Sequence, residues 1–242
     1  MTGRLAVAGA LAVALLTIAG EARTAIPPSL VCKLPQGSEN LPPNARRGLI
    51  GHLLQYPAVQ LATPRQRARA KLVLTRLEVA AERGDWRDLR SARRAGYDTR
   101  ARPRKSGDRR VFYFHAERHQ EPRGRSIFDF TRPKALIYAN APGRPLVLVG
   151  AMWSTRDGEL GPNPAGPILR WHSHVVCKQG KKRGLKPPAG GSCPPGSRLT
   201  QGASEMLHVW FTDDLRSAFA ISAPRPELCS ARLLPGEACR SR

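Results

Sequence analysis

Two short runs of residues hold the side chains in this chain that are most able to do chemistry. Residues 171–174 read WHSH, and residues 205–208 read EMLH. Imidazole nitrogens are common ligands of transition metals, and a carboxylate or a thioether can complete such a shell. The two runs therefore predict a site for one divalent transition metal ion.

Both runs lie in segments rich in β-branched and aromatic residues, which predict strands. Alternate side chains of a strand share a face, so His172 and His174 would point the same way, and His208 would add a third imidazole from a later strand. We expect these three histidines to bind the ion. Residue type alone does not distinguish among copper, zinc, iron and manganese as the bound metal.

Further residues are candidates to complete the shell. Glu205 stands three residues before His208, a spacing that needs a bulge or a bend if both are to share one strand face. It is the candidate general base, and its alternative role is that of a surface carboxylate. His115 closes an aromatic segment and is a candidate fourth ligand, whereas His119, in a polar run, is left outside the site. Met206 is oriented as a ligand or as a core residue, and copper is favoured if its thioether binds.

The first residues predict export. Arg4 precedes an uncharged apolar run over 5–18, and small residues follow it, as in a secretory signal peptide that is cleaved after Ala22. A run of about 15 residues is shorter than the roughly 20 that a membrane span needs. We therefore predict a soluble mature protein that is secreted or periplasmic.

Export changes the expected role of the five cysteines, because disulfides form in oxidising compartments. Cys177 and Cys193 flank a loop rich in Lys, Gly and Pro, and Cys229 and Cys239 flank a short segment near the end. Two local bridges are the simplest pairing. The odd residue, Cys32, either stays reduced or takes one of those partners, so the connectivity is open at this point.

The chain is strongly basic, with 40 Lys and Arg against 18 Asp and Glu and a formal net charge of +22. Such a surface attracts polyanions, including anionic polymers and membrane surfaces. The basic residues are mostly Arg and are spread along the chain, a pattern that a G+C-rich genome also produces. No basic cluster is interleaved with the aromatic residues that stack on nucleotide bases, so there is no specific nucleic-acid motif.

Helix signals come early in the chain and strand signals come late. Thr63 and Pro64 predict a helix start and Gly84 its end, and a second short helix is predicted from Asp85 to about Gly96. The predicted strands cover 111–115, 135–139, 145–153, 167–177 and 206–212. This order predicts an α+β fold in which a helical hairpin precedes an antiparallel β-rich domain, formed as a curled sheet, a sandwich or a cupin-like small barrel.

The predicted organisation has five parts. They are a signal peptide over 1–22, an extended lead-in over 23–44, a helical subdomain over 45–97, a β-rich metal-binding domain over 108–222 and a Cys-containing tail over 223–242.

Several runs resemble those of a family of uncharacterised secreted bacterial proteins. They are FDFTRPKALIY at 128–138, LVGAM at 148–152, WHSH with the following Cys177, CP at 193–194 and MLHVW at 206–210. The resemblance covers about 111–220 and implies that these residues belong together, without naming a reaction. The His-x-His strand with a later histidine is also similar to the metal site of cupins, small β-barrels with three His and one Glu. This chain departs from cupins because no Glu follows His174 at the short cupin interval and the cupin glycines are not in place.

Other catalytic classes lack their signatures. The chain has no Gly-x-Ser-x-Gly elbow, no phosphate-cradling glycine loop and no dinucleotide fingerprint. The sequence thus predicts an exported protein that binds a transition metal ion through a histidine cluster. Two alternatives stay open: a metal-free basic module that holds an anionic partner, and a metal-dependent oxidoreductase or isomerase.

Overall fold

The computed structural model describes residues 34–41, 45–46, 49, 54–99, 112–118, 129, 131–140, 145–156, 159–180, 184–185, 191–201, 204–234 and 239. The predicted signal peptide, Cys32 and His119 lie outside these ranges. Among the helices within them, none combines the length and the apolar composition needed to cross a membrane.

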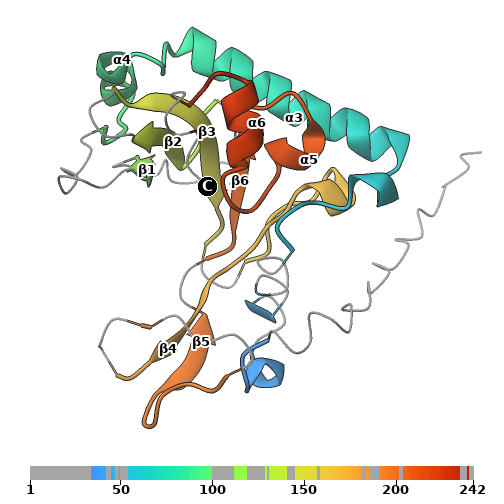
Figure 1. The fold of residues 1–242 in the computed structure, drawn as a ribbon, viewed down its shortest axis with the longest axis vertical. Helices are drawn as coiled ribbons and strands as arrows, with labels where there is room; N and C mark the ends of the chain where they lie inside the picture. Colours follow the sequence, from blue (N-terminus) through green and yellow to red (C-terminus); the bar gives the residue numbers. More distant parts are fainter. Residues whose placement is uncertain are drawn as a thin grey trace, which may run out of the picture.

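The described elements are short helices and strands, with one long helix (Figure 1). In chain order they are the 3-10 helices η1 (Ser38–Asn40) and η2 (Val59–Leu61), α3 (Pro64–Arg83), α4 (Leu89–Arg94), β1 (Phe112–Glu117), β2 (Ala135–Asn140), β3 (Val147–Ser154), η3 (Gly166–Ile168), β4 (Val175–Lys178), β5 (Arg198–Gln201), β6 (Met206–Trp210), α5 (Leu215–Ala218) and α6 (Arg225–Ser230).

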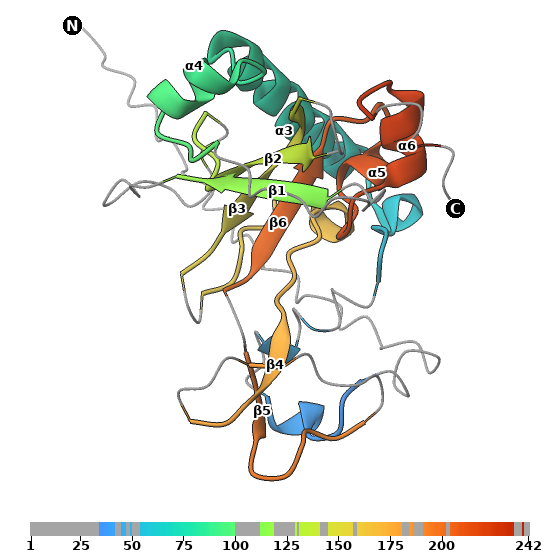
Figure 2. The ribbon, with the colours of Figure 1, turned by 60° about the vertical axis from the view of Figure 1, so that its left-hand side comes forward.

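Four strands form an antiparallel sheet in the order β1-β2-β3-β6, and β4 pairs with β5 in a separate two-stranded sheet (Figure 2). The prediction of an α+β fold with antiparallel strands is confirmed. The described strands do not close into a barrel, so the finer prediction of a cupin-like barrel is not confirmed.

The start of α3 follows its sequence. The side chain of Thr63 accepts a hydrogen bond from the Gln66 amide at 3.2 Å, and the Gln66 side chain accepts one from the Thr63 amide at 2.8 Å. This capping box satisfies donors that the first turn leaves open, and Pro64 has no such donor. The predicted helix start is therefore confirmed.

The second helix starts later than its sequence predicts. Asp85 adopts a left-handed backbone conformation with φ of 48°, which ends α3 and keeps the next helix from starting there. A Cβ at Gly84 would lie 2.2 Å from the Trp86 ring, so glycine lets the buried tryptophan fold back over the turn. The helix α4 begins at Leu89 instead, with the Asp88 side chain accepting from the Ser91 amide as its cap.

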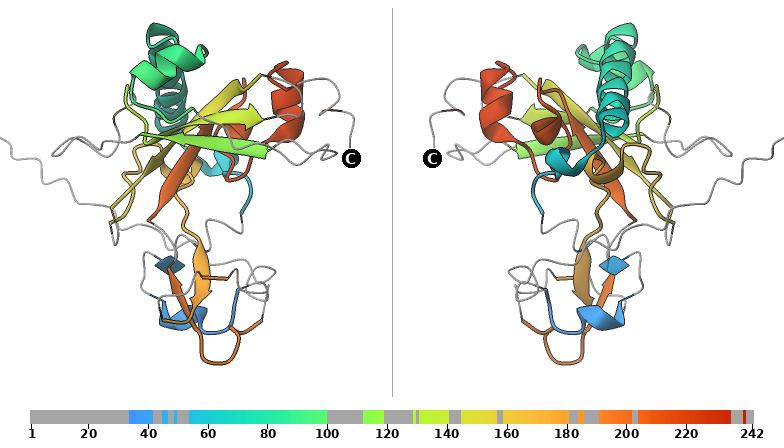
Figure 3. Two further views of the ribbon diagram at one scale, coloured as in Figure 1. Left: turned by 90° about the vertical axis from the view of Figure 1, so that its left-hand side faces the viewer. Right: turned by 90° about the vertical axis from the view of Figure 1, so that its right-hand side faces the viewer.

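The two faces of the four-stranded sheet are covered by different helices (Figure 3). On one face, Leu74 and Leu77 of α3 are buried in one cluster with Leu136 of β2 and Leu207 of β6. On the other face, Leu228 of α6 belongs to a second cluster, whose sheet members include Ile137, Val149, Met152 and Trp210. Burial on both faces explains the apolar runs of β2 and β3.

The predicted strand over 167–177 is not continuous. Its beginning is the 3-10 helix η3, for which Gly166 supplies a positive φ of 58° and Pro167 supplies no backbone donor. The next residues pair with the main sheet at an isolated bridge between His172 and Met206, and β4 then pairs with β5 in the other sheet. The chain thus passes from one sheet to the other between His172 and Val175.

The smaller sheet has a core of its own, in which Leu41, Ala45 and Leu49 pack with Val175. Its strand β5 was not predicted from the sequence. The disulfide between Cys177 and Cys193 closes the loop between its strands, with the two Cα atoms 5.4 Å apart.

The second disulfide joins Cys229 of α6 to Cys239, with Cα atoms 5.8 Å apart. Both predicted pairings are therefore confirmed. Two disulfides indicate an oxidising, extracytoplasmic environment.

Candidate metal centre

Strand β6 presents one of the predicted ligands toward the face covered by α6. Side chains alternate along a strand, so Met206, His208 and Trp210 share one face while Leu207 and Val209 lie on the other. The contacts agree, because Met206 and Trp210 belong to the α6-side cluster and Leu207 belongs to the α3-side cluster. His208 is therefore buried on the α6 side, with 8% of its surface exposed.

The segment that carries His172 runs beside β6 and behaves there as one more strand. The amide of His172 donates to the Met206 carbonyl at 3.0 Å, and the Met206 amide donates to the His172 carbonyl at 2.7 Å. Residues paired in this way share a face, so His172 joins His208 on the α6 side. The two ring centroids are 5.0 Å apart, and His172 is fully buried.

Both buried imidazoles are held by a backbone carbonyl. Nδ1 of His172 lies 3.1 Å from the Arg170 carbonyl oxygen, and Nδ1 of His208 lies 2.6 Å from the Ile221 carbonyl oxygen. A carbonyl only accepts, so Nδ1 of each ring carries a proton, and in the neutral form of the ring Nε2 carries a lone pair. Both Nε2 atoms are buried. Metal-bound histidines in proteins have this arrangement, in which the second ring nitrogen donates to a carbonyl or a carboxylate.

His115 reaches the same region because the sheet is curled. In a flat sheet, β1 and β6 would be about 14 Å apart, three strand spacings, yet the rings of His115 and His208 have centroids 5.6 Å apart. The β2–β3 register shifts between Ile137 and Tyr138, and such a bulge increases the local twist. Burial lowers the pKa of His115, against a smaller opposing effect of the Glu117 charge, and so favours the neutral form that can bind a metal.

His174 is the exposed member of the set. Its ring centroid lies 5.7 Å from that of His172, although the two side chains do not sit on one regular strand as predicted. We call the four residues the histidine row, in the order of contact His115, His208, His172 and His174. The structure thus brings together the three predicted histidine ligands and the candidate fourth.

The ring separations between neighbours in the histidine row are compatible with a shared ion. Two imidazoles on one tetrahedral ion have ring centroids roughly 5 Å apart, since each nitrogen lies about 2.0–2.1 Å from the metal. The observed distances of 5.0, 5.6 and 5.7 Å are close to this value. Within the described residues, no group of three or more His, Cys, Asp or Glu side chains is placed so that it could hold a metal ion. A third imidazole would therefore have to rotate to join the first two.

Glu205 lies on the other face of β6. The Thr155 amide donates to the Glu205 carbonyl at 2.8 Å, which continues the β3–β6 ladder and keeps the alternation of side chains. The buried Glu205 carboxylate accepts a hydrogen bond from the Gly161 amide at 2.8 Å. A Cβ at Gly161 would lie 2.0 Å from the Trp171 ring, so that ring packs directly against the glycine whose amide binds the carboxylate. The structure therefore does not bring Glu205 to the face that carries His208.

Substitution of Glu205 by Gln should separate a structural role from a ligand role. We expect the free energy of unfolding to fall by about 2 kcal/mol, because the charged acceptor of the Gly161 amide is lost. Metal stoichiometry should stay at the wild-type value. Urea unfolding and metal titration measure the two effects, with the exposed Glu159→Gln as control. Loss of metal at unchanged stability would instead make Glu205 a ligand.

Sequence reasoning missed one residue beside the histidine row. Met152 of β3 stands directly opposite His208 in the β3–β6 pairing and is 7% exposed. Nothing in the local sequence marks it, because its position depends on the register between strands that lie more than 50 residues apart in the chain.

The resemblance of the sequence runs to secreted bacterial proteins stays a prediction, and so does the similarity to the cupin metal site. Comparison of this chain with protein-family models, with curated proteins and with solved structures found no match in any of the three.

Proposed function

We propose that this protein is exported and binds one transition metal ion through His172 and His208, with His115 and His174 as the candidates for a third ligand. One observation carries the proposal. Two buried imidazoles from different segments lie 5.0 Å apart, and each is held by a carbonyl at Nδ1, so that its buried Nε2 carries the lone pair.

Buried histidines can also serve only as packing residues. In a metal-free role, the 5.0 Å separation of the two rings would have to result from packing alone, although it is compatible with a shared ion. The polar backbone partners of both rings and the two further imidazoles at their flanks favour a binding role. Metal binding is favoured over catalysis, because the candidate base Glu205 lies on the opposite face of β6.

Zinc titration of the metal-free protein tests the proposal and identifies the third ligand. Wild-type protein should bind one equivalent, and His172→Ala or His208→Ala should weaken binding by at least about 100-fold, more than loss of an outer-shell partner costs. Either His115 or His174 is expected to be the third ligand. Its substitution by Ala should weaken zinc binding to a similar extent, and substitution of the other should have no more effect than the His119→Ala control. Equal affinity in all five variants would contradict the proposal.

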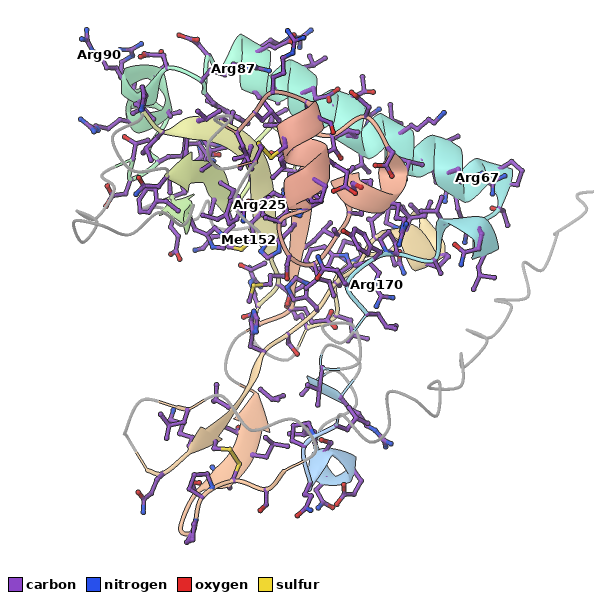
Figure 4. The ribbon with its side chains drawn as sticks, viewed as in Figure 1. Arg67, Arg87, Arg90, Met152, Arg170 and Arg225 are labelled. Carbon is purple, nitrogen blue, oxygen red and sulfur yellow. A yellow bond between two sulfur atoms is a disulfide. The ribbon has the colours of Figure 1, made fainter. Side chains whose placement is uncertain are left out.

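A second candidate function rests on the outer surface of α3. Between Pro64 and Arg94 the chain carries ten Lys or Arg against four Asp or Glu. Figure 4 labels Arg67 near one end of α3 and Arg87 beyond the other. A basic strip thus extends along the helix. It supports the alternative function, a metal-free basic module that holds an anionic partner.

Exposed apolar side chains accompany these charges. Leu72 and Val79 are 47% and 37% exposed, and at a spacing of seven residues they lie on one line of the helix with the exposed Arg65, Arg76 and Arg83. Aliphatic side chains between arginines are typical of helices that lie on anionic membranes. They would add little to the affinity for nucleic acid, which depends mainly on contacts between basic side chains and phosphates. We therefore propose an anionic lipid surface as the partner of this strip.

Vesicle sedimentation tests this second candidate. The protein should bind vesicles that contain phosphatidylglycerol, and binding should weaken at high salt because the charges are screened. The Leu72→Ser, Val79→Ser double variant should reduce the part of vesicle binding that remains at high salt. Glu78→Gln is the control. Equal binding to phosphatidylcholine vesicles, or no binding to either, would rule it out.

A further inference from the structure

Each of the two buried histidines of the row has a methionine directly across from it. Met152 pairs with His208 between β3 and β6, and Met206 forms the isolated bridge with His172. Directly opposed residues on antiparallel strands project from the same face, with Cβ atoms about 4.5–5.5 Å apart. Four side chains therefore lie next to one another on the α6 side of the sheet, and we call them the His/Met patch.

The composition makes this placement informative. The chain has three methionines, of which the first is Met1, so every methionine after the predicted signal peptide lies in the His/Met patch. Met152 is 7% exposed and is labelled in Figure 4, whereas Met206 is only partly buried. Methionine is a common gap filler of protein cores, but that role does not require both residues to oppose a histidine.

The chemistry of the patch differs from that of a zinc or manganese site. Thioethers are soft ligands that select monovalent copper, whereas carboxylates and other oxygen ligands suit harder ions. The carboxylate nearest in sequence, that of Glu205, is bound on the opposite face by the Gly161 amide. The His/Met patch therefore offers nitrogen and sulfur, both neutral.

Charge also favours a monovalent ion. Four neutral ligands leave the charge of the ion uncompensated, and the cost of burying an ion rises with the square of its charge. Three members of the patch are at least nine-tenths buried, namely Met152, His172 and His208. A second positive charge on the ion would make this burial still more costly.

We propose that the ion is copper in its monovalent state and that the thioethers of Met152 and Met206 bind it together with His172 and His208. This inference rests on the proposed function, because it names the metal of the same site. The flanking His115 and His174 then serve harder ions such as zinc, which the thioethers do not bind.

The test uses metal-free protein without oxygen, in competition with a chromophoric Cu(I) chelator, beside a Zn(II) titration. Met152→Leu with Met206→Leu should weaken Cu(I) binding by about 100-fold or more and change Zn(II) binding by less than about threefold. Ile137→Leu, in the same buried cluster, is the matched control for changes in packing. Met206→Leu alone, at the less buried position, gives the same test if the double variant does not fold.

The outcomes separate the two proposals. Unchanged Cu(I) affinity in the methionine variants, with loss in His172→Ala, overturns the thioether ligands and leaves the metal site standing. Stoichiometric Zn(II) binding without Cu(I) binding in the wild type overturns copper as the metal. Binding of neither ion by the wild type overturns the proposed function as well. X-ray absorption of the copper-loaded protein should show sulfur next to the copper in the wild type and only lighter neighbours in the double variant.

Discussion

Saturating zinc should raise the melting temperature of the metal-free wild-type protein by about 10 °C. An ion at 1,000 times its dissociation constant adds about 4 kcal/mol to the folded state. For a chain of this size, 1 kcal/mol shifts the melting temperature by about 2–4 °C. The ion would join β6 to the segment at His172, which pairs with β6 at its bridge to Met206.

The shift should depend on the two buried imidazoles. His172→Ala with His208→Ala should melt at the same temperature with and without zinc, while His119→Ala should keep the full shift. Differential scanning calorimetry measures all three proteins at one zinc concentration. An equal shift in the double variant would mean that zinc binds elsewhere in the chain.

Substitution of Gly150 by Ala should lower the free energy of unfolding by about 3 kcal/mol, at the upper end of the usual cost of overpacking. Gly150 of β3 pairs with Trp210 of β6. An added Cβ would lie 2.5 Å from the Val209 carbonyl oxygen and 3.2 Å from the Trp210 Cα. These are backbone atoms, so relief requires β3 and β6 to separate.

The same substitution should weaken metal binding, because the strand that moves carries His208. Urea unfolding followed by tryptophan fluorescence measures the stability, and zinc titration measures the site. Ser154→Ala, on the same strand and half-buried, is the control and should change stability by less than about 0.5 kcal/mol. A stable Gly150→Ala protein would show that β3 and β6 are not packed as described.

Local rules of sequence predicted the features that depend on neighbouring residues. The start of α3 depends on Thr63, Pro64 and Gln66, which lie within one turn, and it is confirmed. Both disulfides join cysteines that are at most 16 residues apart, so the short loops made their pairing predictable. Four predicted strands appear with shifted ends as β1, β2, β3 and β6.

Features that depend on distant residues could not be predicted in this way. The segment 167–177 has the composition of one strand, but its residues belong to a 3-10 helix, to a bridge in the main sheet and to β4. The contact of His115 with His208 requires the curl of the whole sheet, and the position of Met152 requires the β3–β6 register. The sequence around His172 and His208 predicted that these two side chains lie close together, but it did not predict which other side chains lie beside them.

Metal analysis of the protein isolated from its native compartment tests the central claim most directly. Wild-type protein should contain close to one equivalent of a transition metal, and the His172→Ala, His208→Ala double variant should contain none. Wild-type protein without metal after reconstitution, or equal metal in both proteins, would contradict the metal site.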